Sequence, residues 1–329
     1  MAPEKIRASI GTAAALGLAK QRMDVLPTTA YLMLYTEDRC IGNCAFCPQA
    51  RESSADKNLL SRILWPVYPL EKILEALEGY ESKIIERICL QVINYPGFFE
   101  DVKAIINEIN TRVEIPISLD TSPLKEEELL ELRELGLERI GIPLDAATKE
   151  LFNKIKGREA LGPYTWRKHF KSLKKAVKIF GQGNVMSNII LGLGETEEEA
   201  IKIIQELADI NVPAVLFAFT PIPGTKLRKK PQPDLSYYRR AQVARALILE
   251  KKARIEDMKF TNGRLTDFGI NKVHLREFLK DGAVFQTTGC PGCNRPYYNE
   301  RASGPLYNYP KPLTPEEVDN NTKSLGVDL

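Results

Sequence analysis

Residues 185–219 read VMSNIILGLGETEEEAIKIIQELADINVPAVLFAF, and this stretch decides the fold class. It begins with a continuous apolar run, Val185–Leu191, and ends with a second one, Ala214–Phe219. Between them, the apolar residues of Glu197–Ile210 recur every three or four positions, which is typical of an amphipathic helix. Strands that are apolar throughout and joined by a helix indicate parallel neighbours in a sheet whose faces are covered by helices.

The same alternation continues along most of the chain. Six clear and two weaker apolar runs are predicted as strands: Tyr31–Tyr35, Ile88–Ile93, Ile115–Leu119, Arg139–Leu144, Val185–Leu191, Ala214–Phe219, Lys259–Thr261 and Ala283–Gln286. Amphipathic stretches between them are predicted as helices: Leu70–Leu77, Phe99–Ile109, Lys125–Leu135, Trp166–Ile179, Glu197–Ile210, Tyr237–Lys252 and Lys272–Leu279. Thr196 with Glu199 forms a capping-box pattern, and Ser122 before Pro123 is a typical helix start. Eight strands that alternate with helices favour an α/β fold closed into a (βα)8 barrel of the TIM type.

The two ends of the chain depart from this pattern. Residues 1–29 contain a mild apolar stretch that is too short to span a bilayer, and we expect an amphipathic surface helix there rather than a secretory signal. Residues 30–289 carry the predicted barrel. From residue 290 to 329, prolines, glycines and tyrosines dominate, which predicts an irregular tail that starts at the barrel mouth, where enzymes of this fold hold their active sites.

Composition and charge describe an ordinary soluble globular chain. Of 329 residues, 46 are Lys or Arg and 43 are Asp or Glu, so the net charge is +3. This balance argues against binding to nucleic acid or to a membrane surface through bulk charge. With neither a predicted signal peptide nor a spanning segment, we expect a cytoplasmic protein whose cysteines are reduced thiols, metal ligands or catalytic groups.

Three of the six cysteines are crowded into one short segment, Cys40-Ile-Gly-Asn-Cys44-Ala-Phe-Cys47, shortly after the first predicted strand. Three thiolates in one loop can converge on three corners of an iron–sulfur cluster and leave one iron open to bind a small molecule. The alternative is a zinc site completed by a distant residue. Because the chain has only His169 and His274, a metal site that needs three histidines is excluded.

This spacing, with the aromatic Phe46 before the last cysteine, resembles the signature of the radical S-adenosylmethionine (SAM) enzymes. The resemblance implies that Cys40, Cys44 and Cys47 hold a 4Fe-4S cluster whose open iron binds the methionine part of SAM. In that family, one-electron reduction of the bound SAM releases a 5′-deoxyadenosyl radical. Because the cofactor carries the hard chemistry, a shortage of histidines is no objection.

Further segments extend the resemblance, and within the superfamily it is nearest to biotin synthase. Asn188-Ile-Ile-Leu-Gly-Leu-Gly-Glu195 resembles the family's adenine-contact motif, with Asn188 in place of the usual first glycine. Tyr164–Arg167 matches a Tyr-x-x-Arg whose arginine holds the SAM carboxylate, and Asp145 lies in a matching fourth-strand segment. The resemblance implies that these residues contact the cofactor: Phe46, Gln91, Asn94, Asp145, Arg167, Asn188 and Glu195.

The remaining cysteines predict a second, auxiliary cluster. Cys89 falls where biotin synthase has a cysteine ligand of an auxiliary 2Fe-2S cluster, but two other ligand strands carry Ser118 and Met186 here. Neither residue is a strong thiolate ligand. Instead, Cys290 and Cys293 stand at the predicted barrel mouth. We therefore expect a different auxiliary cluster, of the 4Fe-4S type, held by Cys89, Cys290 and Cys293.

The fourth ligand of that cluster has two candidates. Arg264 lies in a segment that resembles the biotin synthase strand with a cluster-binding arginine, and Ser303 resembles the cluster-binding serine of single-chain lipoyl synthase. Other interpretations stay open at this point. Cys89 fits a buried core residue, and a Cys-x-x-Cys pair fits half of a zinc site or a redox pair.

The tail that begins with Cys290-Pro-Gly-Cys293-Asn-Arg-Pro-Tyr-Tyr resembles the tail of the archaeal two-component lipoyl synthases. This resemblance implies sulfur insertion into an octanoyl chain on a carrier-protein lysine. The implied partners are an octanoylated carrier, such as the glycine cleavage H protein or a lipoyl domain, a sister radical SAM protein, and an electron donor such as ferredoxin. The alternatives are biotin synthase-like sulfur insertion, and a one-cluster mutase or methyltransferase with a structural site at the Cys290–Cys293 pair.

Overall fold

The computed structural model describes residues 2–79, 84–301 and 303–327. Six of its strands are parallel neighbours: β2 (Thr29–Leu34), β6 (Arg87–Gln91), β7 (Ile117–Asp120), β8 (Arg139–Gly141), β9 (Val185–Leu191) and β10 (Ala214–Ala218). Two antiparallel strands, β1 (Lys5–Ala8) and β5 (Val67–Pro69), extend the sheet beyond β2. The strand order is β10-β9-β8-β7-β6-β2-β1-β5. The predicted parallel α/β sheet is thus confirmed for its six clear strands.

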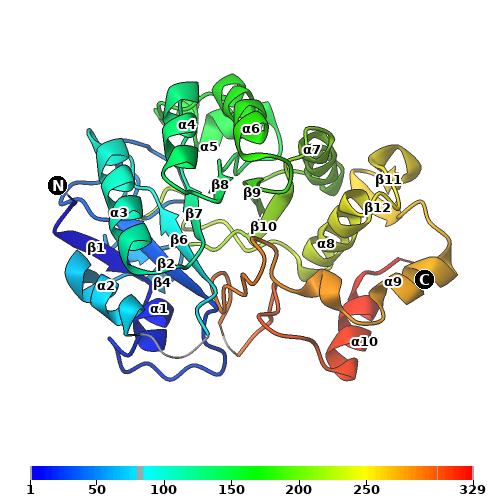
Figure 1. Ribbon diagram of the computed structural model, residues 1–329. Helices are drawn as coiled ribbons and strands as arrows, with labels where there is room; N and C mark the ends of the chain where they lie inside the picture. Colours follow the sequence, from blue (N-terminus) through cyan, green and yellow to red (C-terminus); the bar gives the residue numbers. More distant parts are fainter. Residues whose placement is uncertain (1, 80–83, 302, 328–329) are drawn as a thin grey trace.

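Helices follow most of the parallel strands and cover the outer face of the curved sheet (Figure 1). Their bounds are α1 (Ile10–Ala15), α2 (Leu70–Glu78), α3 (Phe98–Arg112), α4 (Glu126–Glu134), α5 (Lys149–Ile155), α6 (Trp166–Phe180), α7 (Glu197–Asp209), α8 (Leu235–Leu249), α9 (Lys272–Leu279) and α10 (Pro315–Ser324). The Thr196 and Glu199 capping box of α7 is confirmed. By contrast, α4 begins at Glu126, and the Ser122 hydroxyl donates to Asn94 instead of capping the helix.

The two weaker strand predictions are wrong as members of this sheet. Lys259–Thr261 is β11, which pairs only with β12 (Arg264–Asp267) in a separate hairpin. Its turn, Asn262-Gly263, has positive φ at both residues, the conformation that reverses a hairpin in two residues. Ala283–Phe285 is a short 3₁₀ helix. No strand pairing in the described residues joins β10 to β5, so the closed eight-stranded barrel is not confirmed.

Four smaller features complete the fold. The amphipathic helix predicted over residues 1–29 is shorter than expected, because its helical part is α1 alone and β1 precedes it. A small hairpin of β3 (Leu59–Leu60) and β4 (Ile63–Leu64) lies between β2 and β5 in the chain. Two further 3₁₀ turns occupy Arg158–Ala160 and Ile255–Asp257. The helix α5, which is not among the predicted helices, starts at a Thr148 cap.

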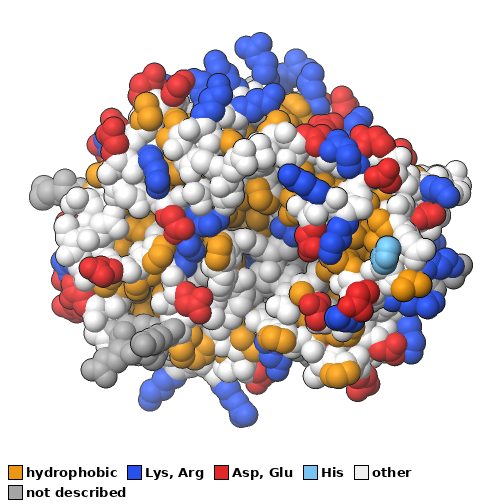
Figure 2. All heavy atoms as spheres, turned by 45° about the vertical axis from the view of Figure 1, so that its right-hand side comes forward, with side chains coloured by type: hydrophobic (Ala, Val, Ile, Leu, Met, Phe, Trp, Pro, Cys, Tyr) orange, Lys and Arg blue, Asp and Glu red, His pale blue; other side chains and the backbone are white. Residues whose placement is uncertain are grey.

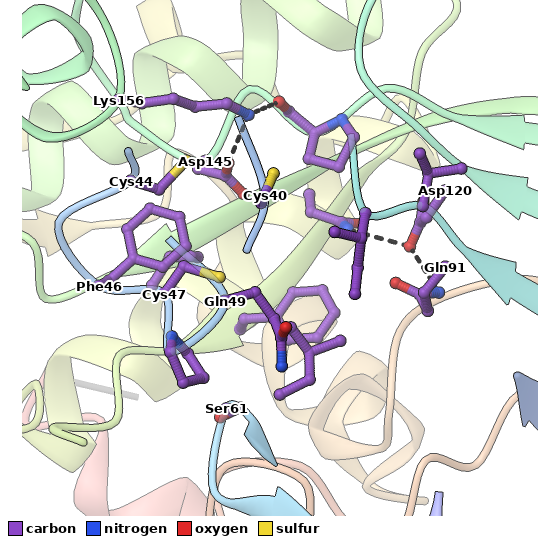
Figure 3. Close-up of a pocket in the computed structure, with 18 of the residues that line it drawn as sticks. Cys40, Cys44, Phe46, Cys47, Gln49, Ser61, Gln91, Asp120, Asp145 and Lys156 are labelled. Atoms are coloured by element: carbon purple, nitrogen blue, oxygen red, sulfur yellow. Dashed lines mark hydrogen bonds and ion pairs between the residues drawn. The ribbon is translucent and has the colours of Figure 1, made fainter. Parts of the chain in front are cut away.

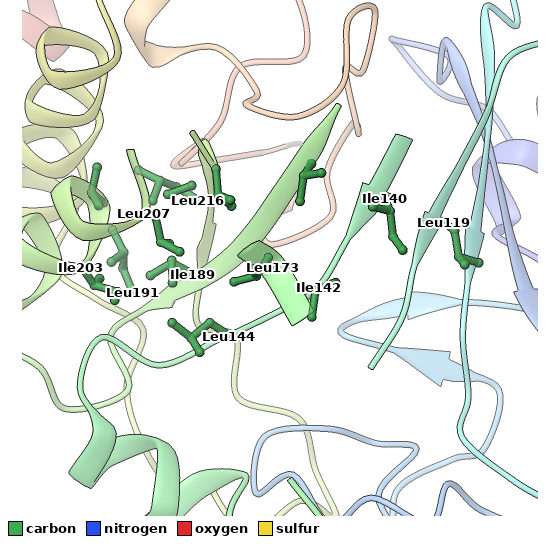
Figure 4. Packing of buried hydrophobic residues seen from close by; sticks show 14 of the residues in the cluster. Leu119, Ile140, Ile142, Leu144, Leu173, Ile189, Leu191, Ile203, Leu207 and Leu216 are labelled. Carbon is green, nitrogen blue, oxygen red and sulfur yellow. The ribbon is translucent and has the colours of Figure 1, made fainter. Parts of the chain in front are cut away.

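The core lies between the sheet and its helices. Figure 4 shows apolar side chains from β7 to β10 together with those of α6 and α7, with Ile189 close to Leu207. These residues are essentially inaccessible to solvent. Truncating a buried Leu or Ile to Ala costs about 2–5 kcal/mol. The packed layer is therefore a firm support for side chains at the carboxyl ends of the strands.

The tail crosses the middle of the molecule and is held at two places along its length (Figure 1). Near its start, the Asn294 side chain donates to the Leu26 carbonyl and accepts from the Thr28 amide. Near its middle, the fully buried Arg239 of α8 donates to the carbonyl groups of Leu306 and Tyr307. Detaching the tail would leave a buried arginine and two carbonyl groups without hydrogen-bond partners, which costs free energy. The tail is therefore packed as a stable part of the fold.

The surface carries charges of both signs, as its near-neutral balance requires. Figure 2 shows acidic and basic side chains scattered over one face, with Lys and Arg gathered along the upper edge, the side on which α6 lies in Figure 1. In the described part of the chain, no helix has the length and apolar character needed to cross a bilayer.

Candidate active site

A cavity of about 230 Å³ contains the three clustered cysteines, and we call it the loop cavity. Cys40, Cys44 and Cys47 lie on one side of it, together with Phe46 (Figure 3). Across the cavity, Gln91 ends β6 and stands where parallel strands present their carboxyl ends. The three thiols, which are half-buried, therefore face the position that barrel enzymes use for binding.

The backbone of the cysteine segment is held by buried polar contacts. The Asn43 side chain is 1% exposed, donates to the Ala160 carbonyl and accepts from the Glu52 amide. The Ala45 amide donates to the Ile155 carbonyl at the end of α5. Gly42 has no room for a side chain, because a Cβ there would lie 2.7 Å from the Tyr164 hydroxyl oxygen. These contacts fix the direction in which the three thiols point.

A buried ion pair borders the same cavity. Lys156, which follows α5, places Nζ 2.6 Å from a carboxylate oxygen of Asp145 and 2.5 Å from the Pro143 carbonyl oxygen. Both side chains are less than a tenth exposed. Asp145 has φ of +67°, an unusual conformation for a residue with a side chain, and it directs the carboxylate into the cavity wall. The pair gives this wall polar groups that can orient a polar ligand.

The surroundings of the loop cavity favour the protonated form of two of its thiols, Cys44 and Cys47. Burial raises the pKa of Cys47 to about 12. Burial also raises the pKa of the Cys44 thiol, and the nearby Lys156 ammonium opposes that rise. Iron supplies the missing positive charge when it binds thiolates, so thiols of this kind become ligands as a metal enters and protons leave.

The other three cysteines meet in a second cavity of about 50 Å³, the tail cavity. Cys89 reaches it from β6, while Cys290 and Cys293 reach it from the tail. In Cys290-Pro291-Gly292-Cys293, the Cys293 amide donates to the Cys290 carbonyl at 3.0 Å, and Gly292 has φ of +76°. Proline followed by glycine with positive φ is typical of a type II turn, which brings the two thiols to the same side.

The two cavities share a wall. Gln91, Asp120, Asn188, Phe217 and Tyr298 line both of them. The Asp120 carboxylate accepts from Gln91 at 3.2 Å and from Asn188 at 3.3 Å, and burial raises its pKa. Gln91 also places its amide nitrogen 3.0 Å from the Cys89 sulfur. One hydrogen-bonded group therefore lines both cavities and contacts Cys89 in the second.

Asp120 depends on a glycine in the next strand. A Cβ at Gly141 of β8 would lie 1.8 Å from an Asp120 carboxylate oxygen, so this position has no room for a side chain. The sequence reasoning did not single out Asp120 or Lys156. Asp120 could have been predicted as a site residue, because it is a polar residue at the carboxyl end of a predicted strand. Lys156 could not, because its partner is found only when the chain folds.

The tail cavity also contains Ser118 and Met186, the residues that stand where biotin synthase has cysteines. Met186 places its sulfur 3.8 Å from the Cys290 sulfur. Cys290 and Cys293 thus reach from the tail into the region that the two strands leave without thiols. The structure places Cys89 and the tail pair around one cavity, and their role as cluster ligands stays a prediction.

Several predicted site residues lie elsewhere. Arg167 is exposed on α6 and lines neither cavity. Glu195 also lines neither cavity, because its carboxylate accepts from the amides of Gly192, Leu193 and Gly194 and from the Tyr237 hydroxyl. Direct cofactor contact by Arg167 or Glu195 is therefore not supported by the geometry. The predicted cofactor contacts that do line the loop cavity are Phe46, Gln91, Asn94, Asp145 and Asn188.

Neither candidate for a fourth auxiliary ligand reaches the tail cavity. Arg264 is exposed on the β11–β12 hairpin and donates to the Gly326 carbonyl. Ser303 is exposed in the tail. Both predictions are wrong in position: the Asn262-Gly263 turn carries Arg264 away from the sheet, and the tail leaves the cavity before Ser303. The tail cavity contains Arg295 instead, a residue that the sequence reasoning did not single out.

The donor set of each cavity fits an iron–sulfur cluster. Within the described ranges, no group of three or more His, Cys, Asp or Glu side chains is placed to hold a single metal ion. A cluster bound by thiolates does not need them to meet at one ion, because each binds a different iron. Three half-buried thiols at each site, with polar and apolar neighbours, match that requirement.

Among curated proteins, the chain is similar to biotin synthases. It is 32% identical to that of Methanococcus aeolicus over 196 residues, which cover 57% of this chain and 54% of the relative. It is 27% identical to that of Clostridium acetobutylicum over 222 residues, which cover 64% and 63%. The chain therefore spans little more than half the length of these relatives.

Solved structures share the fold at low sequence identity. Methylornithine synthase superposes with a TM-score of 0.52 at 16% identity, covering 68% of this chain and 62% of that one. The FeFe-hydrogenase maturase HydG from Carboxydothermus hydrogenoformans gives 0.52 at 18%, covering 67% and 51%. The family model of the radical SAM superfamily matches residues 35–207, which include the cysteine loop and most of the residues that line the loop cavity. The chain is therefore a radical SAM enzyme, a family that implies a 4Fe-4S cluster and SAM.

Proposed function

We propose that this chain inserts sulfur into an octanoyl chain carried on a protein lysine, as one component of a two-protein lipoyl synthase. One observation carries the proposal: two separate sets of three cysteines line adjoining cavities that share a wall. An enzyme that only makes a radical needs the first set. A second set beside it is what a reaction that also supplies sulfur requires.

In this proposal, Cys40, Cys44 and Cys47 hold the cluster that binds SAM, and Cys89, Cys290 and Cys293 hold an auxiliary cluster. When bound, the first cluster with SAM supplies an alkyl radical strong enough for an unactivated C–H bond, and the second supplies sulfur. The shared wall sets the distance between the two sites, and its Gln91–Asp120–Asn188 hydrogen bonds keep that distance constant.

The lining of the loop cavity suits a ligand with polar and apolar parts. Asp145, Lys156 and Asn94 supply charged and amide groups for the SAM side. Ile93, Phe217, Phe219 and Leu60 supply apolar surface, which favours an alkyl chain and excludes water from a reactive intermediate. The same apolar surface gives no hydrogen bond to a polar substrate ring.

The partners follow from the substrate. A lysine-bound acyl chain is presented by an acidic carrier such as a lipoyl domain or the glycine cleavage H protein, and the basic segment 226–230 after β10 offers complementary charge. A sister radical SAM protein would complete the second insertion. A ferredoxin-type donor would supply electrons.

A biotin synthase-like reaction is the second candidate, because the curated relatives carry that name. Both candidates insert sulfur at unactivated carbon, and they differ in substrate and auxiliary cluster. The replacement of two strand cysteines by Ser118 and Met186, with the tail cysteines beside them, favours the first candidate.

Two substrates in parallel test the proposal. Anaerobically reconstituted protein, SAM and dithionite are incubated with an octanoyl-lysyl peptide or with dethiobiotin, and the products are analysed by mass spectrometry. We expect 5′-deoxyadenosine and a peptide that has gained one sulfur atom. Thiolation of dethiobiotin alone would support the second candidate. Formation of 5′-deoxyadenosine without sulfur transfer to either substrate would indicate a one-cluster mutase or methyltransferase.

A further inference from the structure

Three hydrogen-bond donors line the tail cavity, and one of them has no acceptor among the described residues. Besides its three cysteines, the cavity is lined by Trp65, Tyr31 and Arg295, which come from three separate parts of the chain. An indole N–H and a guanidinium can only donate. We asked what ligand would need donors at this place.

Trp65 gives the clearest indication. Its side chain is 0% exposed, and its indole Nε1 has no hydrogen-bond partner in the described residues. It packs with Tyr31, Met33 and Ile93 in a small apolar group against which Cys89 and Cys293 also pack. A buried N–H without an acceptor is costly, and such groups call for an explanation such as an absent ion or ligand. Because Trp65 lines the tail cavity, an acceptor bound in that cavity would supply the missing partner.

Tyr31 is already arranged to donate to sulfur. Its hydroxyl oxygen lies 3.2 Å from the Cys293 sulfur and accepts the Arg295 amide hydrogen at 3.1 Å. Because the amide occupies a lone pair of that oxygen, the hydroxyl hydrogen is available for Cys293. When Cys293 is a thiolate, the bond becomes charge-assisted and stronger.

Arg295 supplies the positive charge. Among the described residues that line the tail cavity it is the only Lys or Arg, and it is 8% exposed. Its guanidinium lies over the Phe217 ring at 3.9 Å and makes one long contact, 3.4 Å, to the Leu216 carbonyl. Most of its five N–H groups therefore have no protein acceptor among these contacts. Asp120 supplies one negative charge in the same cavity. Three thiolates would add more negative charge, which a buried guanidinium would stabilise.

We propose that Trp65, Tyr31 and Arg295 donate hydrogen bonds to the sulfur atoms of the auxiliary cluster and thereby raise its reduction potential. This inference rests on the auxiliary cluster of the proposed function. Donors and positive charge stabilise negative charge on sulfur, and the reduced cluster carries one electron more than the oxidised one. Hydrogen bonds to the sulfurs are among the factors that set the potentials of such clusters.

The test uses full-length chain in which Cys40, Cys44 and Cys47 are alanine, so that only an auxiliary cluster can form. Tyr31→Phe and Trp65→Phe are added singly, because each keeps an aromatic ring and removes only the donor group or part of the ring. Matched controls are Tyr68→Phe on β5 and Trp166→Phe on α6, which line neither cavity. Each protein is reconstituted anaerobically, assayed for iron, and titrated with dithionite while the cluster is followed by electron paramagnetic resonance.

We expect unchanged iron content in all variants and a lower midpoint potential in Tyr31→Phe and Trp65→Phe. A tenfold weaker reduction equilibrium corresponds to a shift of about 59 mV for a one-electron couple. Unchanged iron with potentials equal to those of the controls would overturn this inference and leave the proposed function intact. Absence of iron already in the parent triple variant would instead overturn the auxiliary cluster and the proposed function with it.

Discussion

The loop cavity and the tail cavity collect the same number of cysteines in opposite ways. Cys40, Cys44 and Cys47 fall within eight residues, so one loop places them whatever the rest of the chain does. Cys89 and the Cys290–Cys293 pair are roughly 200 residues apart and meet only because the tail returns across β6. The cysteines of the loop cavity are therefore positioned by local sequence, whereas those of the tail cavity are brought together by tertiary structure. Substitutions in the tail should therefore affect the cluster of the tail cavity and leave the cluster of the loop cavity in place.

The largest effect is expected from the tail cysteines. Cys290→Ala combined with Cys293→Ala removes two thiolates from the tail cavity and none from the loop cavity. We expect sulfur transfer to be abolished while 5′-deoxyadenosine formation under dithionite continues, because the radical site keeps its ligands. Chromatography of both products from the same reaction checks this. Loss of 5′-deoxyadenosine together with product would show that the sites are not independent.

The buried ion pair of Lys156 and Asp145 tests whether the wall of the loop cavity depends on paired charges. Lys156→Met leaves the Asp145 carboxylate buried without its partner, which typically costs about 3–5 kcal/mol. We expect a lower unfolding midpoint in urea and weaker SAM binding, with auxiliary iron retained. The matched control is Lys156→Met combined with Asp145→Asn, which removes the uncompensated charge and should recover part of the stability. An equal loss in both variants would contradict the charge argument.

Arg239, which binds the tail through two carbonyl groups, tests the dependence of the tail cavity on tertiary structure. Arg239→Met leaves the Leu306 and Tyr307 carbonyls without their donor, and each buried unsatisfied acceptor costs about 1–3 kcal/mol. Because Arg239 of α8 holds the tail, we expect loss of auxiliary iron before loss of the loop cluster. Iron analysis and the rate of 5′-deoxyadenosine formation distinguish the two. Parallel loss of both would mean that Arg239 supports the whole fold rather than the tail.

The smallest effect is expected from Ser303 and Arg264, the two predicted fourth ligands that lie outside the tail cavity. Ser303→Ala and Arg264→Ala change exposed residues outside both cavities, so each should alter stability by no more than about 0.5 kcal/mol. Iron content and sulfur transfer should equal those of the unmodified chain. A loss of about half of the iron in either variant would show that the tail closes differently from the structure described here.

The same contrast explains how much the sequence could predict. The six clear strands, the cysteine loop and the contacts at Asp145 and Asn188 follow from patterns within a few residues, and they were predictable. Arg295 contacts residues far away in the chain, and Lys156 meets Asp145 only across α5 and the turn before it, so no local sequence pattern indicates either residue. Arg264 was misplaced by a family resemblance, although Asn262-Gly263 beside it is a recognisable hairpin turn.

Iron analysis of the triple variant Cys40→Ala, Cys44→Ala, Cys47→Ala tests most directly whether a second, independent cluster exists. The protein is reconstituted anaerobically, freed of loose iron by gel filtration and analysed for iron and sulfide. The account predicts about four irons per chain, all held in the tail cavity. About two irons would indicate a smaller cluster of the biotin synthase kind. Complete loss of iron would contradict the account, because the tail cavity would then hold no cluster and the enzyme would have no source of sulfur.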